Sequence, residues 1–139
     1  MDELQQVNRS RWNDLVRARI AYTRPWLDLT PDIARARVDP YNMLGDVTGK
    51  TVLVLSGGGG QQSAALAMLG AQVTVLDLSD EQLKSDRAAL AHYGLTATVL
   101  PAAGAARLLC ANDRIRVRFV GVANRGGQLM DAFLTQRDV

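Results

Sequence analysis

The residues with the clearest chemical potential are four consecutive glycines, Gly57–Gly60, and an aspartate, Asp77, twenty positions after the first of them. Glycines allow positive φ angles and let a ligand come close to the main chain. The helix that follows offers unpaired N–H groups and the positive end of its dipole. A carboxylate at the end of the next strand can accept hydrogen bonds from ribose hydroxyls. Together these residues predict a site for an adenosine-containing ligand.

Two other interpretations of these residues remain open. In the first, the glycines form only a tight turn and Asp77 caps the next helix. In the second, the loop is the dinucleotide motif G-x-G-x-x-G, whose third glycine lets the helix pack on the strand. That third position is Gln62 or Ser63, depending on which glycine begins the motif. A bulky or polar residue there argues against a pyrophosphate ligand.

The elements that would position this site alternate between strands and helices. Apolar, β-branched runs predict strands over residues 51–56, 73–78 and 96–100, the first two of the kind buried on both faces. Helices are expected over 61–69, ended by Gly70, and from Ser79 to about Tyr93, with Ser79 and Gln82 at capping-box spacing. Helical connections of this length imply parallel strands. The sequence therefore predicts an α/β fold with a Rossmann-like parallel sheet, incomplete at about three to four strands.

The first fifty residues predict an N-terminal helical cap and a linker. A helix is expected over residues 8–23, capped by Asn8 or Ser10 and stopped before Pro25. Its apolar stripe consists of Trp12, Leu15, Val16 and Ile20, with the stem of Arg19 along it. A shorter helix is expected after Thr30, which is the predicted N-cap, and ends at Asp39-Pro40. Trp12, Tyr22 and Trp26 could line a substrate pocket or belong to the core.

Residues 51–83, TVLVLSGGGGQQSAALAMLGAQVTVLDLSDEQL, resemble the cofactor-binding motifs of class I S-adenosylmethionine-dependent methyltransferases. The likeness is to a branch with a GGGQQ loop and a VTVxDxSxxQL second strand, and it covers about residues 8–100. It implies that the loop lies against the methionine part of S-adenosylmethionine, that Asp77 binds the ribose hydroxyls and that Leu78 flanks the adenine. The implied cofactor-binding residues are Ser56, Gly57, Gly58, Gly59, Gly60, Gln61, Gln62, Asp77 and Leu78. The segment 51–100 is thus expected to be a cofactor-binding half-domain.

The likeness weakens at two places. The acidic residue that many such enzymes carry two positions before the loop is Val54 here, and the one expected after the third strand is missing from Leu100-Pro101-Ala102-Ala103. The later strands, which usually supply substrate contacts and any catalytic base, have no recognisable counterpart. We therefore expect a truncated or frame-shifted gene product with an atypical arginine-rich tail over 101–139 and no assignable catalytic residue. The tail's weaker patterns predict a helix over 102–110, a half-exposed strand over 114–123 and a helix over 127–136.

Composition limits the other functions. The net charge of +2 arises from −1 over residues 1–100 and +3 over residues 101–139. With one cysteine, Cys110, and one histidine, His92, we expect neither an internal disulfide nor a metal centre. Arg114, Arg116 and Arg118 alternate with apolar residues as on a solvated strand face, so no nucleic-acid partner is expected. No stretch approaches the ~20 apolar residues of a membrane span, and the N-terminus is too polar for a secretory signal, so we expect a cytoplasmic protein without a membrane partner.

The expected function is methyl transfer from S-adenosylmethionine to a small-molecule acceptor, with activity impaired by the missing half-sheet. One alternative is a non-catalytic cofactor-binding fragment or remnant, whose open sheet edge could pair with a second chain. A weaker alternative is a fragment of an NAD-binding oxidoreductase.

Overall fold

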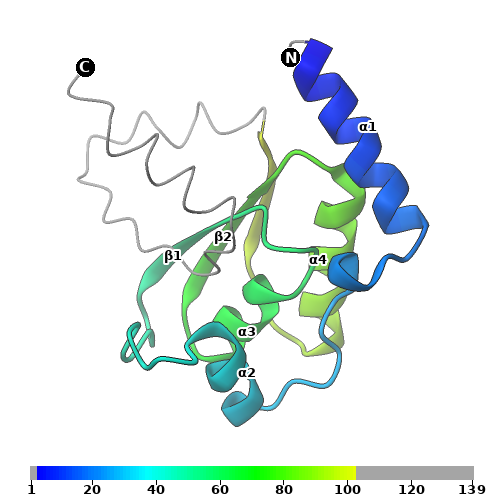
Figure 1. Cartoon of the computed structure of the whole chain (residues 1–139). Coiled ribbons are helices and arrows are strands. Elements are labelled where there is room, and N and C mark those ends of the chain that lie inside the picture. The colour runs from blue at the N-terminus through cyan, green and yellow to red at the C-terminus, as the bar shows by residue number, and fades with distance from the viewer. Residues whose placement is uncertain (1–2, 103–139) are drawn as a thin grey trace, which may run out of the picture.

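The computed structural model describes residues 3–102, which form helices and a parallel sheet (Figure 1). In chain order the elements are α1 (Glu3–Arg17), the 3₁₀ turn η1 (Ala21–Thr23), α2 (Pro31–Val38), β1 (Thr51–Leu55), α3 (Gln62–Met68), β2 (Gln72–Asp77), α4 (Asp80–His92) and β3 (Thr98–Pro101). The three strands lie in the order β1-β2-β3, and both neighbouring pairs are parallel. The α/β fold predicted from the βαβαβ order is confirmed, with three strands in the described part of the sheet.

The hydrophobic core lies between the sheet and the two crossover helices α3 and α4, which cover the same face (Figure 1). Val54 pairs in register with Val75, and both are buried. Four of the seven residues of α3 have small side chains (Ser63, Ala64, Ala65 and Ala67), and all four are buried. Small side chains let α3 fit closely between the sheet and α2, which packs on its outer side.

The opposite face of the sheet differs from the sequence-based expectation. Side chains alternate along a strand, so Leu55, Leu76 and Leu100, which are paired across the three strands, share the face that α3 and α4 do not cover. Leu55 is 46% exposed, and Val54 is the only buried residue of β1. The prediction that residues 51–56 are buried on both faces is therefore wrong.

Most helix ends are where the sequence predicted them. The Thr30 hydroxyl accepts a hydrogen bond from the Ile33 N–H at 3.3 Å, and the Ser79 hydroxyl accepts one from the Gln82 N–H at 3.1 Å. Gly70 and Gly94 adopt positive φ angles after α3 and α4, as residues ending a helix commonly do. The predicted capping box is only half formed, because the Ser79 N–H donates to Asp77 rather than to the Gln82 side chain.

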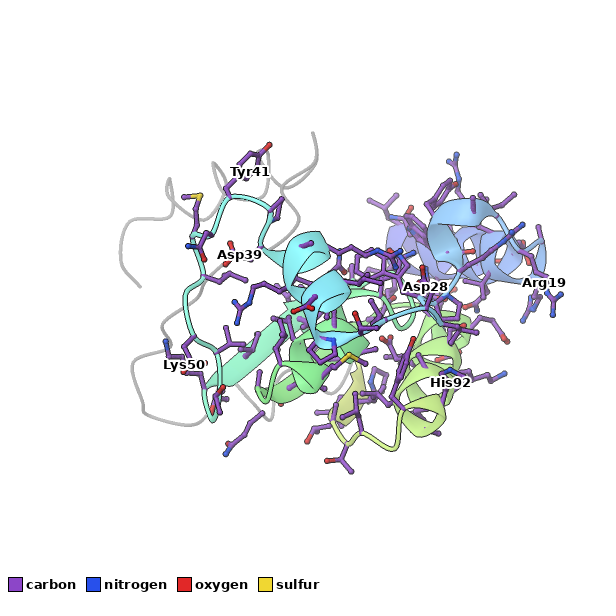
Figure 2. The ribbon with its side chains drawn as sticks, turned by 90° about the horizontal axis from the view of Figure 1, so that it is seen from below. Arg19, Asp28, Asp39, Tyr41, Lys50 and His92 are labelled. Carbon is purple, nitrogen blue, oxygen red and sulfur yellow. The ribbon has the colours of Figure 1, made fainter. Side chains whose placement is uncertain are left out.

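The first helix is wrongly placed by the sequence prediction of 8–23. Helix α1 begins at Glu3 and ends at Arg17, so the predicted caps Asn8 and Ser10 lie inside it. The chain turns after α1 at Arg19, which has a φ of +53° and extends away from the rest of the fold (Figure 2). No residue of α1 is fully buried, and hydrogen bonds from Arg9 and to Asn13 join the helix to the start of α4. Of the predicted apolar stripe, Leu15, Val16 and Ile20 are half-buried and Trp12 is exposed.

Several predicted features lie outside the described residues. These are the helix over 102–110, the strand over 114–123, the helix over 127–136 and nearly all of the arginine-rich tail over 101–139. Within residues 3–102, no helix combines the length and the apolar character required to cross a membrane.

Candidate functional site

The candidate site lies at the carboxyl ends of β1 and β2, where the glycine loop and Asp77 come together. Leu55 is paired with Leu76, and the Ser56 N–H extends the ladder by donating to the Leu76 carbonyl at 2.9 Å. Ser56 is exposed and has a φ of +52°, which is uncommon for a residue with a side chain. The sharp turn directs the chain out of the sheet and over α4. In open parallel sheets, ligands bind at this edge.

The glycines of the loop serve packing as well as backbone conformation. Gly58, Gly59 and Gly60 all have positive φ angles, between +67° and +92°. A Cβ atom on Gly60 would lie 2.5 Å from the Ala89 Cβ on α4, so the loop rests directly on that helix. Gly58 is the partly exposed member of the run. The close packing of α4 against the loop explains why residue 60 is a glycine. That a ligand also approaches the main chain of the loop stays a prediction.

Asp77 is the last residue of β2, and only 7% of it is exposed. Its Oδ1 accepts a hydrogen bond from the Ser79 N–H at 2.8 Å, which shapes the turn into α4. Burial raises the pKa of the Asp77 carboxyl, and hydrogen bonds from the backbone of Ser79 and Leu78 oppose that rise. Ser79, not Asp77, supplies the N-cap side chain of α4. The interpretation of Asp77 as the cap of α4 is therefore wrong: Asp77 accepts one hydrogen bond in the turn before the helix, and Ser79 is the cap.

The two glutamines and Leu78, which were also predicted as cofactor contacts, have different surroundings. The Gln61 side chain donates from Nε2 to the backbone carbonyls of Tyr22 and Arg24, at 3.2 and 2.8 Å, and so ties the N-terminal segment to the loop. Gln62 begins α3, and its Oε1 lies 3.4 Å from where a Cβ atom on Gly57 would be. Leu78 is half-buried beside Asp77. Their roles as cofactor contacts stay predictions.

Two buried polar residues of α4, Gln82 and Asp86, lie beneath the loop. The sequence prediction did not include Asp86 in the site and assigned Gln82 only to a capping box. Asp86 is 0% exposed, and its Oδ1 accepts hydrogen bonds from the Gly60 N–H, at 2.7 Å, and from the Ser63 hydroxyl. Burial raises the pKa of Asp86 to about 6. A signal existed in the sequence, because Gln82 and Asp86 occupy the same helical stripe as the buried Leu83 and Leu90. A polar side chain on the buried face of a helix usually has a hydrogen-bond partner on the element that packs against that face.

The aromatic residues near the N-terminus do not form a core. Trp12 and Tyr22 are 37% and 57% exposed, and their rings meet edge to face with centroids 6.2 Å apart. Trp26 is half-buried against the core, with the Arg37 guanidinium 5.0 Å from its ring centre. The prediction that Trp12 and Tyr22 belong to the core is therefore wrong. Their role as substrate contacts stays a prediction.

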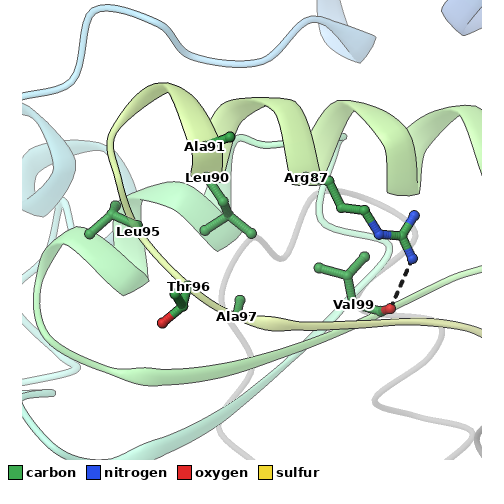
Figure 3. A pocket seen from close by; sticks show the side chains of 7 residues that line it. All are labelled: Arg87, Leu90, Ala91, Leu95, Thr96, Ala97 and Val99. Atoms are coloured by element: carbon green, nitrogen blue, oxygen red, sulfur yellow. Dashed lines mark hydrogen bonds between the residues drawn. The ribbon is translucent and has the colours of Figure 1, made fainter.

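A shallow hollow lies at the other end of the sheet, between α4 and the amino end of β3 (Figure 3). It is lined mainly by apolar side chains and by Arg87, whose guanidinium donates to the Val99 carbonyl at 3.1 Å. The carboxyl ends of the strands, where the loop and Asp77 lie, are at the far end of β2 and β3. The hollow is therefore distinct from the candidate site.

Comparison with known proteins gives one informative similarity. The chain is 47% identical over 57 residues to the "Uncharacterized methyltransferase YbaJ" of Bacillus subtilis (strain 168). The matched segment covers 41% of this chain and 22% of that protein, so the chain spans about a fifth of the length of this relative. No protein-family model matches the chain.

Proposed function

We propose that this chain carries the cofactor-binding part of an S-adenosylmethionine-dependent methyltransferase that acts on a small-molecule acceptor. The observation that carries the proposal is the meeting of the glycine loop and Asp77 at the adjoining carboxyl ends of β1 and β2. The similarity to a protein named as a methyltransferase supports the same reaction class.

The residues at this edge fit a ligand that combines a ribose with polar groups. Asp77 uses Oδ1 for the Ser79 N–H, and a carboxylate can accept more than one hydrogen bond, so it retains capacity for ribose hydroxyls. Ser56 and Gly58 leave main chain accessible at the turn, because Ser56 is exposed and Gly58 partly so. Leu78, half-buried next to Asp77, offers an apolar surface for an adenine ring. Bound S-adenosylmethionine would supply a methyl group on a positively charged sulfur.

The contribution of the chain to the reaction would be binding and orientation. A positioned pair of reactants gains much of its rate from orientation alone, and a base is needed only where the acceptor carries a proton that must leave. We assign no such base among residues 3–102.

The direct test is titration calorimetry of the chain with S-adenosylmethionine, its demethylated product and NAD. We expect binding of the first two and not of NAD. Tight binding of NAD alone would overturn the proposal and favour an oxidoreductase fragment. Binding of S-adenosylmethionine without methyl transfer to any acceptor would support the non-catalytic fragment instead.

Asp77→Ala tests the role of the carboxylate. We expect the variant to lose about 1–3 kcal/mol of binding free energy for S-adenosylmethionine, because charge-assisted hydrogen bonds to the ribose would be missing. Asp46→Ala is a matched control, because the Asp46 Oδ1 accepts from the N–H two residues on, at Thr48, just as the Asp77 Oδ1 accepts from Ser79. Equal affinity of the Asp77 variant and the wild type would mean that Asp77 only shapes its turn.

A further inference from the structure

A buried carboxylate on α4 holds the glycine loop from the side away from solvent. The Asp86 Oδ1 accepts from the Gly60 N–H, in the loop, and from the Ser63 hydroxyl, in the first turn of α3. Asp86 and Ser63 are both 0% exposed. One oxygen atom thus joins α4 to the loop and to the helix that follows it.

The residue before α3, Gln61, does not cap the helix with its side chain. The Gln61 side chain forms no capping hydrogen bond and instead donates to the carbonyls of Tyr22 and Arg24. Asp86, on the neighbouring α4, contacts this region through the Gly60 N–H, which precedes α3, and through the Ser63 hydroxyl, in the first turn of α3.

The contact surface leaves the loop little freedom to shift. A Cβ atom on Gly59 would lie 2.1 Å from the Gln82 Oε1, and one on Gly60 would lie 3.0 Å from the Ser85 carbonyl oxygen. The loop therefore follows the surface of α4 at two successive residues. Its curvature is determined by α4 as well as by the glycines' own conformational freedom.

Two acceptor atoms on this surface lack a partner. Among the side chains that the structure describes, the buried oxygens without a hydrogen bond are Gln82 Oε1 and Asp86 Oδ2. These residues are four positions apart on α4, so they share one helix face. An asparagine at position 86 would keep one acceptor oxygen and bring an N–H group to this face.

We propose that Asp86 is the positioning residue of the glycine loop, fixing through Gly60 and Ser63 the loop shape that the cofactor requires. That Asp86 fixes the shape of the loop does not depend on the proposed function. That the cofactor requires this shape rests on the proposed function. The two parts therefore need separate readouts.

The loop is tested by hydrogen exchange of the full chain without ligand, followed by mass spectrometry. We expect Asp86→Ala to speed exchange within residues 57–63 by about tenfold or more, because the acceptor for the Gly60 N–H is lost. Asp86→Asn keeps an acceptor oxygen and should restore exchange to nearly the wild-type rate. Asp14→Asn, which removes a carboxylate from the exposed side of α1, should leave residues 57–63 unchanged.

The result that would overturn the loop assignment is equal exchange in the alanine and asparagine variants, or faster exchange spread evenly over all peptides. If Asp86→Ala does not fold, Ser63→Ala and Asp86→Asn decide instead. We then expect Ser63→Ala to speed exchange within residues 57–63 several-fold and Asp86→Asn not to do so. No change with Ser63→Ala would overturn the assignment.

The cofactor part is tested by titrating S-adenosylmethionine into the same variants. We expect about tenfold weaker binding to Asp86→Ala and recovery in Asp86→Asn. Faster loop exchange with unchanged affinity would overturn the cofactor part alone. Absence of binding by the wild type would refute the proposed function, while the exchange data would still decide the role of Asp86 in the loop.

Discussion

The buried carboxyl of Asp86 should make the stability of the fold depend on pH. Burial raises its pKa from the ordinary value of 3.8 to about 6, hydrogen bonds from Ser63 and Gly60 oppose the rise, and the charges of Asp77 and Arg87 act in opposite directions. The folded state therefore holds this proton more tightly than the unfolded state does. The free energy of unfolding that the protonated Asp86 contributes is fully present below about pH 4 and is lost as the pH rises through about 6.

Asp86→Asn should remove this dependence. A difference of about two pKa units corresponds to about 3 kcal/mol between the two protonation states, which is an upper value for the effect at pH 8. Asparagine resembles the protonated carboxyl, because it is uncharged and keeps an acceptor for Gly60 and Ser63. We expect the variant to be more stable than the wild type by about 1–3 kcal/mol at pH 8 and nearly equal to it at pH 4.

The assay is urea unfolding followed by circular dichroism at several pH values between 4 and 8. Asp14→Asn is the control, because Asp14 is an exposed carboxylate with an ion pair to Arg17 on the same helix. A stability difference for Asp86→Asn that stays constant across this range would show that the pKa of Asp86 is not raised. A less stable variant at pH 8 would show that the charged hydrogen bonds to Gly60 and Ser63 outweigh the effect of burial.

Two further variants test how the loop and α1 are held. Gly60→Ala should lower the free energy of unfolding by about 1–3 kcal/mol more than Gly94→Ala, because both alanines would need positive φ but only the first would meet the Ala89 side chain; equal effects in urea unfolding would contradict the packing argument. Asn13→Ala should lower the free energy of unfolding by about 1 kcal/mol and speed hydrogen exchange in α1, because the Asn13 Oδ1 accepts hydrogen bonds at the start of α4. Asn8 is exposed, so Asn8→Ala should have neither effect. Identical exchange in the two variants would refute the role of Asn13 in holding α1.

The parts of the fold that could be predicted are those that local sequence determines. The strand and helix order from residue 51 to 101, the caps Thr30 and Ser79 and the glycines that end α3 and α4 all follow from apolar runs and from residues with strong positional preferences. The edge of the sheet at which the glycine loop meets Asp77 follows from the same order, because parallel strands end on the same side.

The parts that could not be predicted depend on contacts between distant residues. Helix α1 has no buried side chain, and Asn13 and Arg9 attach it to residues at the start of α4 more than sixty positions away. Its end is marked by Arg19 in a left-handed conformation, which arginine rarely adopts and which no local pattern signals. The apolar stripe proposed for this region therefore identified a helix but not its boundaries.

The same distinction applies to the candidate site. Glycines next to a strand indicate that something approaches the main chain closely, and the sequence suggested a ligand. At Gly60 the structure brings α4 into that position, with Asp86 as acceptor for its N–H. A side chain on Gly60 would thus be excluded even if nothing were bound, whereas Ser56 and Gly58 face no such restriction from α4. Substitutions at Gly60 consequently report on folding, whereas the proposed direct contacts with a ligand are tested by substitutions at Asp77 and at the accessible residues of the turn.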